Sequence, residues 1–153
     1  MKRVVVGRPK VPADQITIPG LNIQYPWSQL IVTGKKTVET RAYPIPLHLL
    51  NRELALIETP GRMGKKHGIS SARIIAIITF SNCFQYGSKE QWLNDKHRHR
   101  VALDDSQYTY TTKGSRWGWE ISKVSPLQKP QEGPKRKGIV FTRECSVCTG
   151  ARD

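Results

Sequence analysis

The segment YPWSQLIVTGKKTVETR, residues 25–41, contains the signals for a helix, a turn and a strand in direct succession. Pro26 supplies the backbone angle that suits the first turn of a helix. Apolar side chains then recur at the spacing of one helical face: Trp27, Leu30 and Ile31. Gly34 can adopt the left-handed conformation that ends a helix, and the β-compatible residues 37–43 follow at once. The segment therefore predicts a short helix, a tight corner and a strand.

Three charged side chains come from this corner, namely Lys36 in the turn and Glu39 and Arg41 on the strand. Side chains alternate along a strand, so Glu39 and Arg41 share a face. A lysine offers a point charge to a phosphate, an arginine a planar set of donors, and a glutamate an acceptor for a base amine or a proton. Together they predict a pocket for a polar ligand. The plainer alternative is an exposed ion pair worth ~0–1 kcal/mol.

The rest of the chain alternates short apolar segments with segments rich in glycine, proline and charge. β-Branched and aromatic residues predict further strands over residues 16–23 (interrupted at Pro19-Gly20), 54–58, 73–84, 108–112, 116–124 and 139–142. A polar helix is predicted over residues 88–100 with Ser88 as its N-cap, and residues 59–67 are predicted to be a basic loop. Short strands with few helices indicate an α+β fold, in which the strands curl into a small β-barrel with short flanking helices.

The length of 153 residues suits one domain, which would bury ~70% of its unfolded surface. We expect a basic N-terminal arm over residues 1–14, one folded domain over residues 15–143, and a polar C-terminal tail over residues 144–153. The first residues carry too short an apolar run for a signal peptide. Three cysteines, an odd number, do not make a disulfide framework. We therefore expect an intracellular protein, in the cytoplasm, and a monomer.

Charge narrows the classes of partner. Lys and Arg number 25 against 12 Asp and Glu, which leaves a formal net charge of +13, and a field of that sign attracts polyanions. No stretch approaches the ~20 apolar residues that a membrane span needs, so we expect no membrane partner. RNA or DNA is the favoured partner and an acidic protein is the alternative. Solubility alone is the plain explanation of the charge.

The residues Gly34-Lys35-Lys36-Thr37-Val38-Glu39-Thr40-Arg41 are similar to the GxKxxExR signature of the ASCH family (activating signal cointegrator homology), which is related to the PUA domains. The likeness continues outside the motif, in the helix lead-in of residues 21–30, in Asn82-Cys83-Phe84, in Trp117-x-Trp119, and in residues 139–141 with the Gly/Lys-rich stretch before them. The chain thus resembles an ASCH domain over residues 20–142, which is nearly all of its predicted fold.

The resemblance implies a PUA-like β-barrel with a cleft beside the motif that binds RNA or a nucleotide, a modified one included. Some small bacterial members resemble enzymes that cleave the acetyl amide of N4-acetylcytidine or cut RNA, using a lysine and a threonine of the motif with a distant glutamate. Lys36 occupies the lysine position, Glu39 stands at the threonine position, and Glu90 lies in the later segment. Because Glu39 lacks a hydroxyl group, the resemblance favours binding. A metal-independent hydrolase is the alternative, and a protein-interaction domain in a transcription or RNA-processing assembly is a weaker one.

Further residues are expected at an RNA-binding surface. Aromatic rings stack on bases and neighbouring cations contact phosphates. Trp117, with Arg116 beside it, is the candidate pocket wall, and core packing is expected for at least one of Trp117 and Trp119. The apolar face of its helix favours packing for Trp27, with an edge of the cleft as the alternative. The basic loop adds three cations: Arg62, Lys65 and Lys66. The basic clusters at residues 96–100 and 135–137 suit either phosphate contact or a solvated surface.

Two pairs of potential metal ligands occur in the sequence. His97 and His99 have no carboxylate or cysteine at ligand spacing beside them, and Cys145-x-x-Cys148 has only Cys83 as a further thiol. A structural zinc site normally needs four ligands. We therefore expect no metal and no cofactor.

Overall fold

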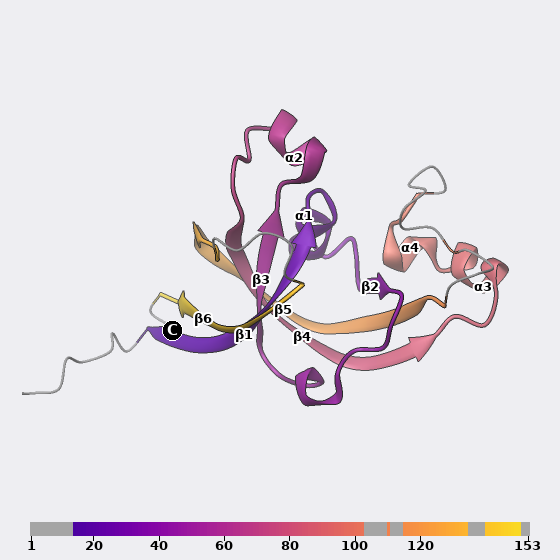
Figure 1. The fold of residues 1–153 in the computed structure, drawn as a ribbon. Helices are drawn as coiled ribbons and strands as arrows, with labels where there is room; N and C mark the ends of the chain where they lie inside the picture. The colour runs from indigo at the N-terminus through magenta and orange to yellow at the C-terminus, as the bar shows by residue number, and fades with distance from the viewer. Residues whose placement is uncertain (1–13, 103–109, 111–114, 135–139, 151–153) are drawn as a thin grey trace, which may run out of the picture.

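A six-stranded sheet forms the frame of the protein, with short helices on its periphery (Figure 1). The computed structural model describes residues 14–102, 110, 115–134 and 140–150. None of the helices in these ranges has the length and apolar character to cross a membrane. The strands are β1 (Gln15–Gln24), β2 (Val38–Arg41), β3 (Leu54–Thr59), β4 (Arg73–Gln85), β5 (Trp117–Glu132) and β6 (Phe141–Cys148). The helices are α1 (Trp27–Val32), α2 (Gly61–Lys66), α3 (Lys89–Asn94) and α4 (Lys96–His99), with a 3₁₀ turn η1 (Leu47–Leu49).

The strands run in the order β2-β5-β4-β3-β1-β6. Strand β1 pairs in parallel with β3, whereas β1–β6, β2–β5, β3–β4 and β4–β5 are antiparallel. The mixed α+β class is therefore confirmed. The long strands β4 and β5 run side by side across the molecule (Figure 1).

The described strands do not close into the predicted β-barrel. Strands β2 and β6 are the two edges of the sheet, and within the described residues no backbone ladder joins β2 to β1 or β6. The sheet nevertheless curls strongly: three strands separate β5 from β6 in the sheet, yet the Trp119 ring of β5 stacks on the Phe141 ring of β6 with centroids 6.2 Å apart. A side chain bridges the opening, where Arg41 Nη2 donates a hydrogen bond to the Asn22 carbonyl at 2.8 Å. Curling without closure leaves room for a cavity between β1 and β2.

Apolar side chains meet inside the curve of the sheet. The main cluster includes fully buried residues from several elements: Leu21, Ile31, Leu54, Leu56, Ile78, Phe80 and Trp119. Trp119 packs edge-on against Phe80 at 5.6 Å and donates its indole N–H to the Tyr43 carbonyl at 3.1 Å. Of the two tryptophans of the late Trp-x-Trp strand, Trp119 is thus core and Trp117 is half-buried against it.

Strand β1 continues through Pro19-Gly20, where an interruption was expected. Its pairing with β6 shifts register between Ile18 and Gly20. Such a bulge accommodates a proline, which has no N–H to donate to the ladder. Gly20 is also sterically required, because a Cβ at this position would lie 2.6 Å from the Ile57 side chain.

The last two strands are longer than predicted. Pairing with β4 carries β5 to Glu132, past Pro126 and Pro130, so the glycine- and lysine-rich stretch begins inside a strand. Pairing with β1 carries β6 to Cys148, and residues 144–148, expected in a polar tail, lie in the sheet. The strand predicted over residues 108–112 and the basic cluster at 135–137 lie outside the described residues, except for Tyr110.

The helical segments also differ in part from expectation. Ser88 caps α3 as predicted, with its hydroxyl accepting from the Gln91 N–H at 3.1 Å, but the predicted helix breaks into α3 and α4 around Asp95. The segment predicted as a basic loop contains helix α2, which stands away from the sheet (Figure 1).

A buried carboxylate fastens α1 to the sheet. Glu58, at the end of β3, is fully buried. Its Oε2 accepts hydrogen bonds from the Ser28 hydroxyl at 2.7 Å and the Gln29 amide at 2.6 Å, while its Oε1 accepts from Arg73 Nε at 2.7 Å. Buried charge is tolerated when it is paired and hydrogen-bonded in this way. The network fixes the helix that leads into the corner at Gly34.

Candidate nucleotide-binding cavity

A cavity of about 640 Å³ opens where the end of β1, α1 and β2 come together. Its wall includes residues 22–24 of β1, Trp27 at the start of α1, and residues 39–41 of β2. The wall also includes residues from other parts of the chain, among them Lys36, Tyr43, Val101, Arg116 and Val140. Pockets for small molecules typically enclose about 300–1,000 Å³.

Lys36 is a buried lysine, with 1% of its surface exposed. Its Nζ donates to the His99 carbonyl at 2.5 Å and lies 3.9 Å from Glu39 Oε1. Burial lowers the pKa of the Lys36 ammonium from its usual 10.5, Glu39 opposes the shift, and Arg41 adds to it. An amine with a lowered pKa exchanges a proton more readily near neutral pH than an exposed lysine does.

Glu39 lies between the two cations. One of its oxygens accepts from the Thr40 N–H at 2.9 Å, and the other lies 3.9 Å from Arg41 Nη2. The Arg41 guanidinium lies 5.7 Å from the centroid of the Trp119 ring. A backbone hydrogen bond thus holds the Glu39 carboxylate at the cavity, and the Trp119 ring holds the Arg41 guanidinium there.

The corner before β2 is held in place by α4, far away in the sequence. Gly34 has a positive φ of 79°, which ends α1 as predicted. The Thr37 N–H donates to the Arg98 carbonyl at 3.0 Å, and Arg100 Nε donates to the Lys35 carbonyl at 3.0 Å. These bonds, together with the Lys36–His99 contact, fix the direction in which Lys36 points.

His99 is the main contributor to the site that the sequence analysis missed. The sequence places His99 in a basic cluster, but its side chain is fully buried. Its Nδ1 accepts from the Val101 N–H at 3.0 Å, which makes Nε2 the donor to the Trp92 carbonyl at 2.8 Å. The ring also stacks on Trp92 with centroids 4.4 Å apart. This pattern fits a neutral imidazole that positions its own carbonyl for Lys36.

Asp95 and Arg98 support this arrangement. The Asp95 carboxylate accepts from the Tyr86 hydroxyl at 2.5 Å and from Arg98 Nε at 2.5 Å. Burial alone would raise the pKa of Asp95, but the hydrogen bonds from Arg98 and Tyr86 lower it overall. The charged pair therefore fixes the short helix that carries His99.

His99 should make stability depend on pH. Burial lowers its pKa from the usual 6.5, as does Lys36, whereas the bond to Trp92 and the charge of Asp95 oppose the shift. Below pH 6.5 the unfolded chain binds a proton that the folded chain does not yet bind, so the free energy of unfolding should fall by at most about 1.4 kcal/mol per pH unit. Above pH 6.5 the contribution of His99 to the free energy of unfolding should be fully maintained. Urea denaturation between about pH 7.5 and pH 5.5 measures the slope.

Two variants give the control for this prediction. His99→Gln, whose amide can replace one of the two ring hydrogen bonds, should lose most of the slope. His97→Gln removes an exposed imidazole from the same helix and should keep it. An identical pH slope in wild type and His99→Gln would refute the assignment.

Comparison with known proteins decides the family. The sequence model of the ASCH domain matches residues 21–131. The chain belongs to the ASCH domain family. No curated protein sequence matches it significantly.

Crystal structures of an ASCH protein from Zymomonas mobilis have a similar fold. A serine-to-alanine variant of that protein superposes with a TM-score of 0.61 at 16% identity, covering 82% of this chain and 86% of the other. The unmodified protein gives 0.60 at 16% identity, covering 82% and 85%. A tyrosine-to-phenylalanine variant gives 0.60 at 16% identity, covering 82% and 88%. At this identity the likeness supports the fold.

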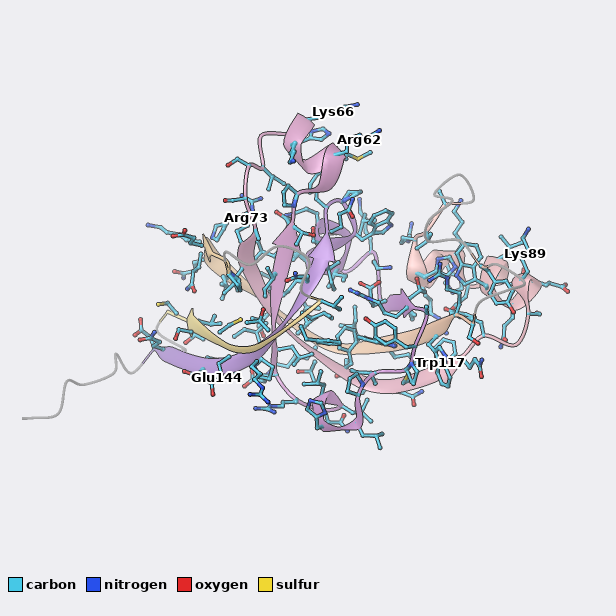
Figure 2. The ribbon with its side chains drawn as sticks, in the orientation of Figure 1. Arg62, Lys66, Arg73, Lys89, Trp117 and Glu144 are labelled. Carbon is cyan, nitrogen blue, oxygen red and sulfur yellow. The ribbon has the colours of Figure 1, made fainter. Side chains whose placement is uncertain are left out.

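The ASCH domain brings together five of the predicted site residues at the cavity: Trp27, Lys36, Glu39, Arg41 and Arg116. Gly34 shapes the corner, and the half-buried Trp117 and the exposed Glu90 are not among the residues that line the cavity. Helix α2 touches the cavity through Gly61 only, and its three cations lie exposed farther out: Arg62, Lys65 and Lys66. Figure 2 shows Arg62 and Lys66 at the end of the helix that stands away from the sheet.

Metal ligands do not gather in the described part of this ASCH domain, where no three His, Cys, Asp or Glu side chains are grouped suitably. Cys145 is buried and Cys148 is exposed, as expected for residues an odd number apart on one strand. Both are free thiols, as is Cys83.

Proposed function

We propose that this ASCH domain binds RNA or a nucleotide, a modified one included, in the cavity beside Lys36, Glu39 and Arg41. The family to which the chain belongs is generally associated with RNA binding. The formal net charge of +13 favours a polyanionic partner. A basic surface attracts any RNA, so the cavity has to supply the recognition of a particular base.

The proposal rests on the convergence of three charged groups at one sheltered cavity. An exposed ion pair costs little to maintain, but Lys36 and Glu39 are both buried, at 1% and 7% exposure. Charges taken out of water need partners, and here Lys36 has the His99 carbonyl, Glu39 has the Thr40 N–H, and the ion pairs are 3.9 Å long. Contacts at 3.9 Å are longer than good hydrogen bonds, so donors and an acceptor remain for a polar ligand.

The chemistry of these groups suits a nucleotide. Arg41 presents a planar fork to a base edge or a phosphate, Glu39 accepts from an exocyclic amine, and Lys36 offers a point charge. Trp27 and Tyr43 line the same cavity and provide ring surfaces on which a base could stack. The exposed cations of α2 would then contact phosphates that lie outside the cavity.

A metal-independent hydrolase acting on RNA or on N4-acetylcytidine-type nucleosides is the second candidate. The lowered pKa of Lys36 favours it, because a neutral amine can act as a base. Glu39, 3.9 Å away, could relay the proton. Glu90 stays the third residue of this hypothesis, although it lies on α3 away from the cavity lining.

Binding and product analysis with matched lysine variants test both candidates. Lys36→Met should weaken binding of single-stranded RNA roughly tenfold or more, whereas Lys35→Met removes an adjacent exposed charge and should have little effect. Wild-type affinity should fall steeply with salt as phosphate contacts are lost. Equal losses in the two variants would refute the cavity as the binding site, and salt-independent association would favour a protein-interaction domain.

Incubation with N4-acetylcytidine and with structured RNA separates binding from hydrolysis. Product formed by the wild type and lost in both Lys36→Ala and Glu39→Gln would establish the hydrolase. Turnover unchanged in both variants would exclude these residues from catalysis. For the favoured function we expect saturable binding without product.

A further inference from the structure

A second cavity, of about 370 Å³, lies beside the antiparallel pairing of β1 with β6. Turn η1 forms one side of it and the first residues of β6 form the other. Its basic side chains come from both sides: His48 and Arg52 from the turn, and Arg143 from β6. Among the described residues that line it, none is acidic.

Within the described residues, the two arginines of this cavity lack the carboxylate partner that three other arginines have; Arg62 and Arg100 are likewise exposed and outside the ion pairs, but they line neither cavity. Arg41, Arg73 and Arg98 each pair with a carboxylate. Arg52 and Arg143 are both exposed, and neither forms an ion pair with any residue in the described ranges. Two guanidinium groups at one hollow, without a counter-charge from the described chain, favour an anionic ligand.

The backbone holds Arg52 at this place. The preceding residue, Asn51, has a positive φ of 58°, a conformation that asparagine tolerates better than most residues. Its N–H donates to the Phe80 carbonyl at 2.8 Å, which ties the turn to β4. On the other side, Arg143 follows Thr142, which pairs with Gly20 beside the β1 bulge. Both arginines therefore extend from backbone fixed by the sheet.

The two cavities lie next to each other. Val140 lines the first and Phe141 lines the second. On β1, Asn22 lines the first cavity and Pro19 the second, so three residues of strand, about 10 Å, separate them. Tyr43 and Val140 both line the first cavity and are 38% and 39% exposed, which gives an exposed apolar surface on the first cavity, and Val140 directly precedes Phe141 of the second.

We infer that the second cavity binds a backbone phosphate of the same single-stranded RNA whose nucleotide occupies the first cavity, with the exposed Tyr43 ring of the first cavity as a stacking surface. The inference rests on the proposed function. Basic grooves interleaved with exposed rings are how proteins hold single strands. Arg52 and Arg143 would contribute affinity to an oligonucleotide and none to a mononucleotide, because only the longer ligand reaches them.

The test compares ligands of increasing length with two double variants of equal charge. Arg52→Gln/Arg143→Gln changes the second cavity. Lys89→Gln/Lys123→Gln removes two exposed cations that line neither cavity; Lys89 lies on the peripheral helix α3 (Figure 2). Fluorescence anisotropy with a labelled mononucleotide and with labelled single-stranded RNA oligonucleotides, repeated over a range of salt, gives affinity and salt slope.

We expect the second-cavity variant to lose roughly tenfold in oligonucleotide affinity at low salt and to reduce the slope of log K against log salt by about 1. Its mononucleotide affinity should be unchanged, and the control variant should lose clearly less. Equal losses in the two double variants, or an equal loss for the mononucleotide, would overturn the inference. Failure of the proposed function looks different: Lys36→Met would then leave all binding intact, whatever the second-cavity variant does.

Discussion

Replacing Glu58 by alanine is expected to lower the free energy of unfolding by about 3 kcal/mol, which corresponds to a fall in Tm of roughly 6–12 °C. The substitution removes the shared acceptor of Ser28, Gln29 and Arg73. The Ser28 side chain is fully buried, so its hydroxyl loses a partner that water cannot replace. Arg73 is partly exposed, so water can hydrate its guanidinium once Glu58 is gone. The expected loss of stability therefore lies at the low end of the range for breaking a buried ion pair. Thermal and urea unfolding measure the change.

Two further variants show whether the network or the charge is responsible. Glu58→Gln keeps the shape and one acceptor oxygen but loses the ion pair with Arg73, so it should cost about half as much. Glu144→Ala removes an exposed carboxylate from β6 and should change stability by less than about 0.5 kcal/mol. A Glu58→Ala protein as stable as Glu144→Ala would contradict the role given to the network.

This prediction concerns the site as well as the fold. Helix α1 places Trp27 at the cavity, and Gly34 follows its last turn directly before the corner that carries Lys36. Loosening its attachment to β3 frees the segment that positions both. We therefore expect Glu58→Ala to weaken ligand binding even at temperatures where the protein stays folded.

The parts of the structure that the sequence predicted are those set by near neighbours along the chain. Pro26 and Gly34 delimit α1, Ser88 caps α3, and the β-branched run of β4 forms a strand. In each case the physical cause lies within a few residues: a fixed φ, a left-handed glycine, a side-chain acceptor or an apolar pattern. Such signals are readable without knowledge of the rest of the molecule.

The features that were missed are set by pairing with distant strands. Strand β5 continues past Pro126 and Pro130 because β4 lies beside it, and β6 extends to Cys148 because β1 does. The openness of the sheet depends on how far its two edges stay apart, which no local pattern encodes. The barrel was expected from the family resemblance and the number of strands, neither of which determines closure.

The same distinction applies to the candidate site. The motif residues Lys36, Glu39 and Arg41 were predictable because strand alternation brings two of them to one face. Their partners were not: the acceptor for Lys36 is the carbonyl of His99, 63 residues away, and the acceptor for Arg41 is that of Asn22. A weak signal existed for His99, since a histidine beside the apolar Val101 at a helix end is a poor candidate for a purely solvated cluster.

Arg41 connects the edge strand β2 with strand β1 and lines the first cavity. Its Nη2 donates to the Asn22 carbonyl at 2.8 Å and lies 3.9 Å from Glu39, and its guanidinium contacts the Trp119 ring. A guanidinium has five N–H donors in a fixed plane, so donors remain at the cavity when one is used by Asn22. Lysine cannot reproduce this geometry, because its ammonium is a compact charge without a planar fork.

Replacing Arg41 by glutamine is expected to weaken RNA binding about 100-fold, or about 2.8 kcal/mol, which lies within the range for truncating one partner of a hydrogen-bonded charge pair at an interface. Arg41→Lys separates charge from geometry: it should lose most of the affinity yet keep the wild-type slope of log K against log salt, whereas Arg41→Gln should reduce that slope by about 1. Arg62→Gln, on the exposed face of α2, should lose less than tenfold. Anisotropy titrations at several salt concentrations measure all three, with thermal unfolding as the check on folding. Full affinity in Arg41→Lys would mean that the cavity attracts RNA by charge alone and does not recognise a base.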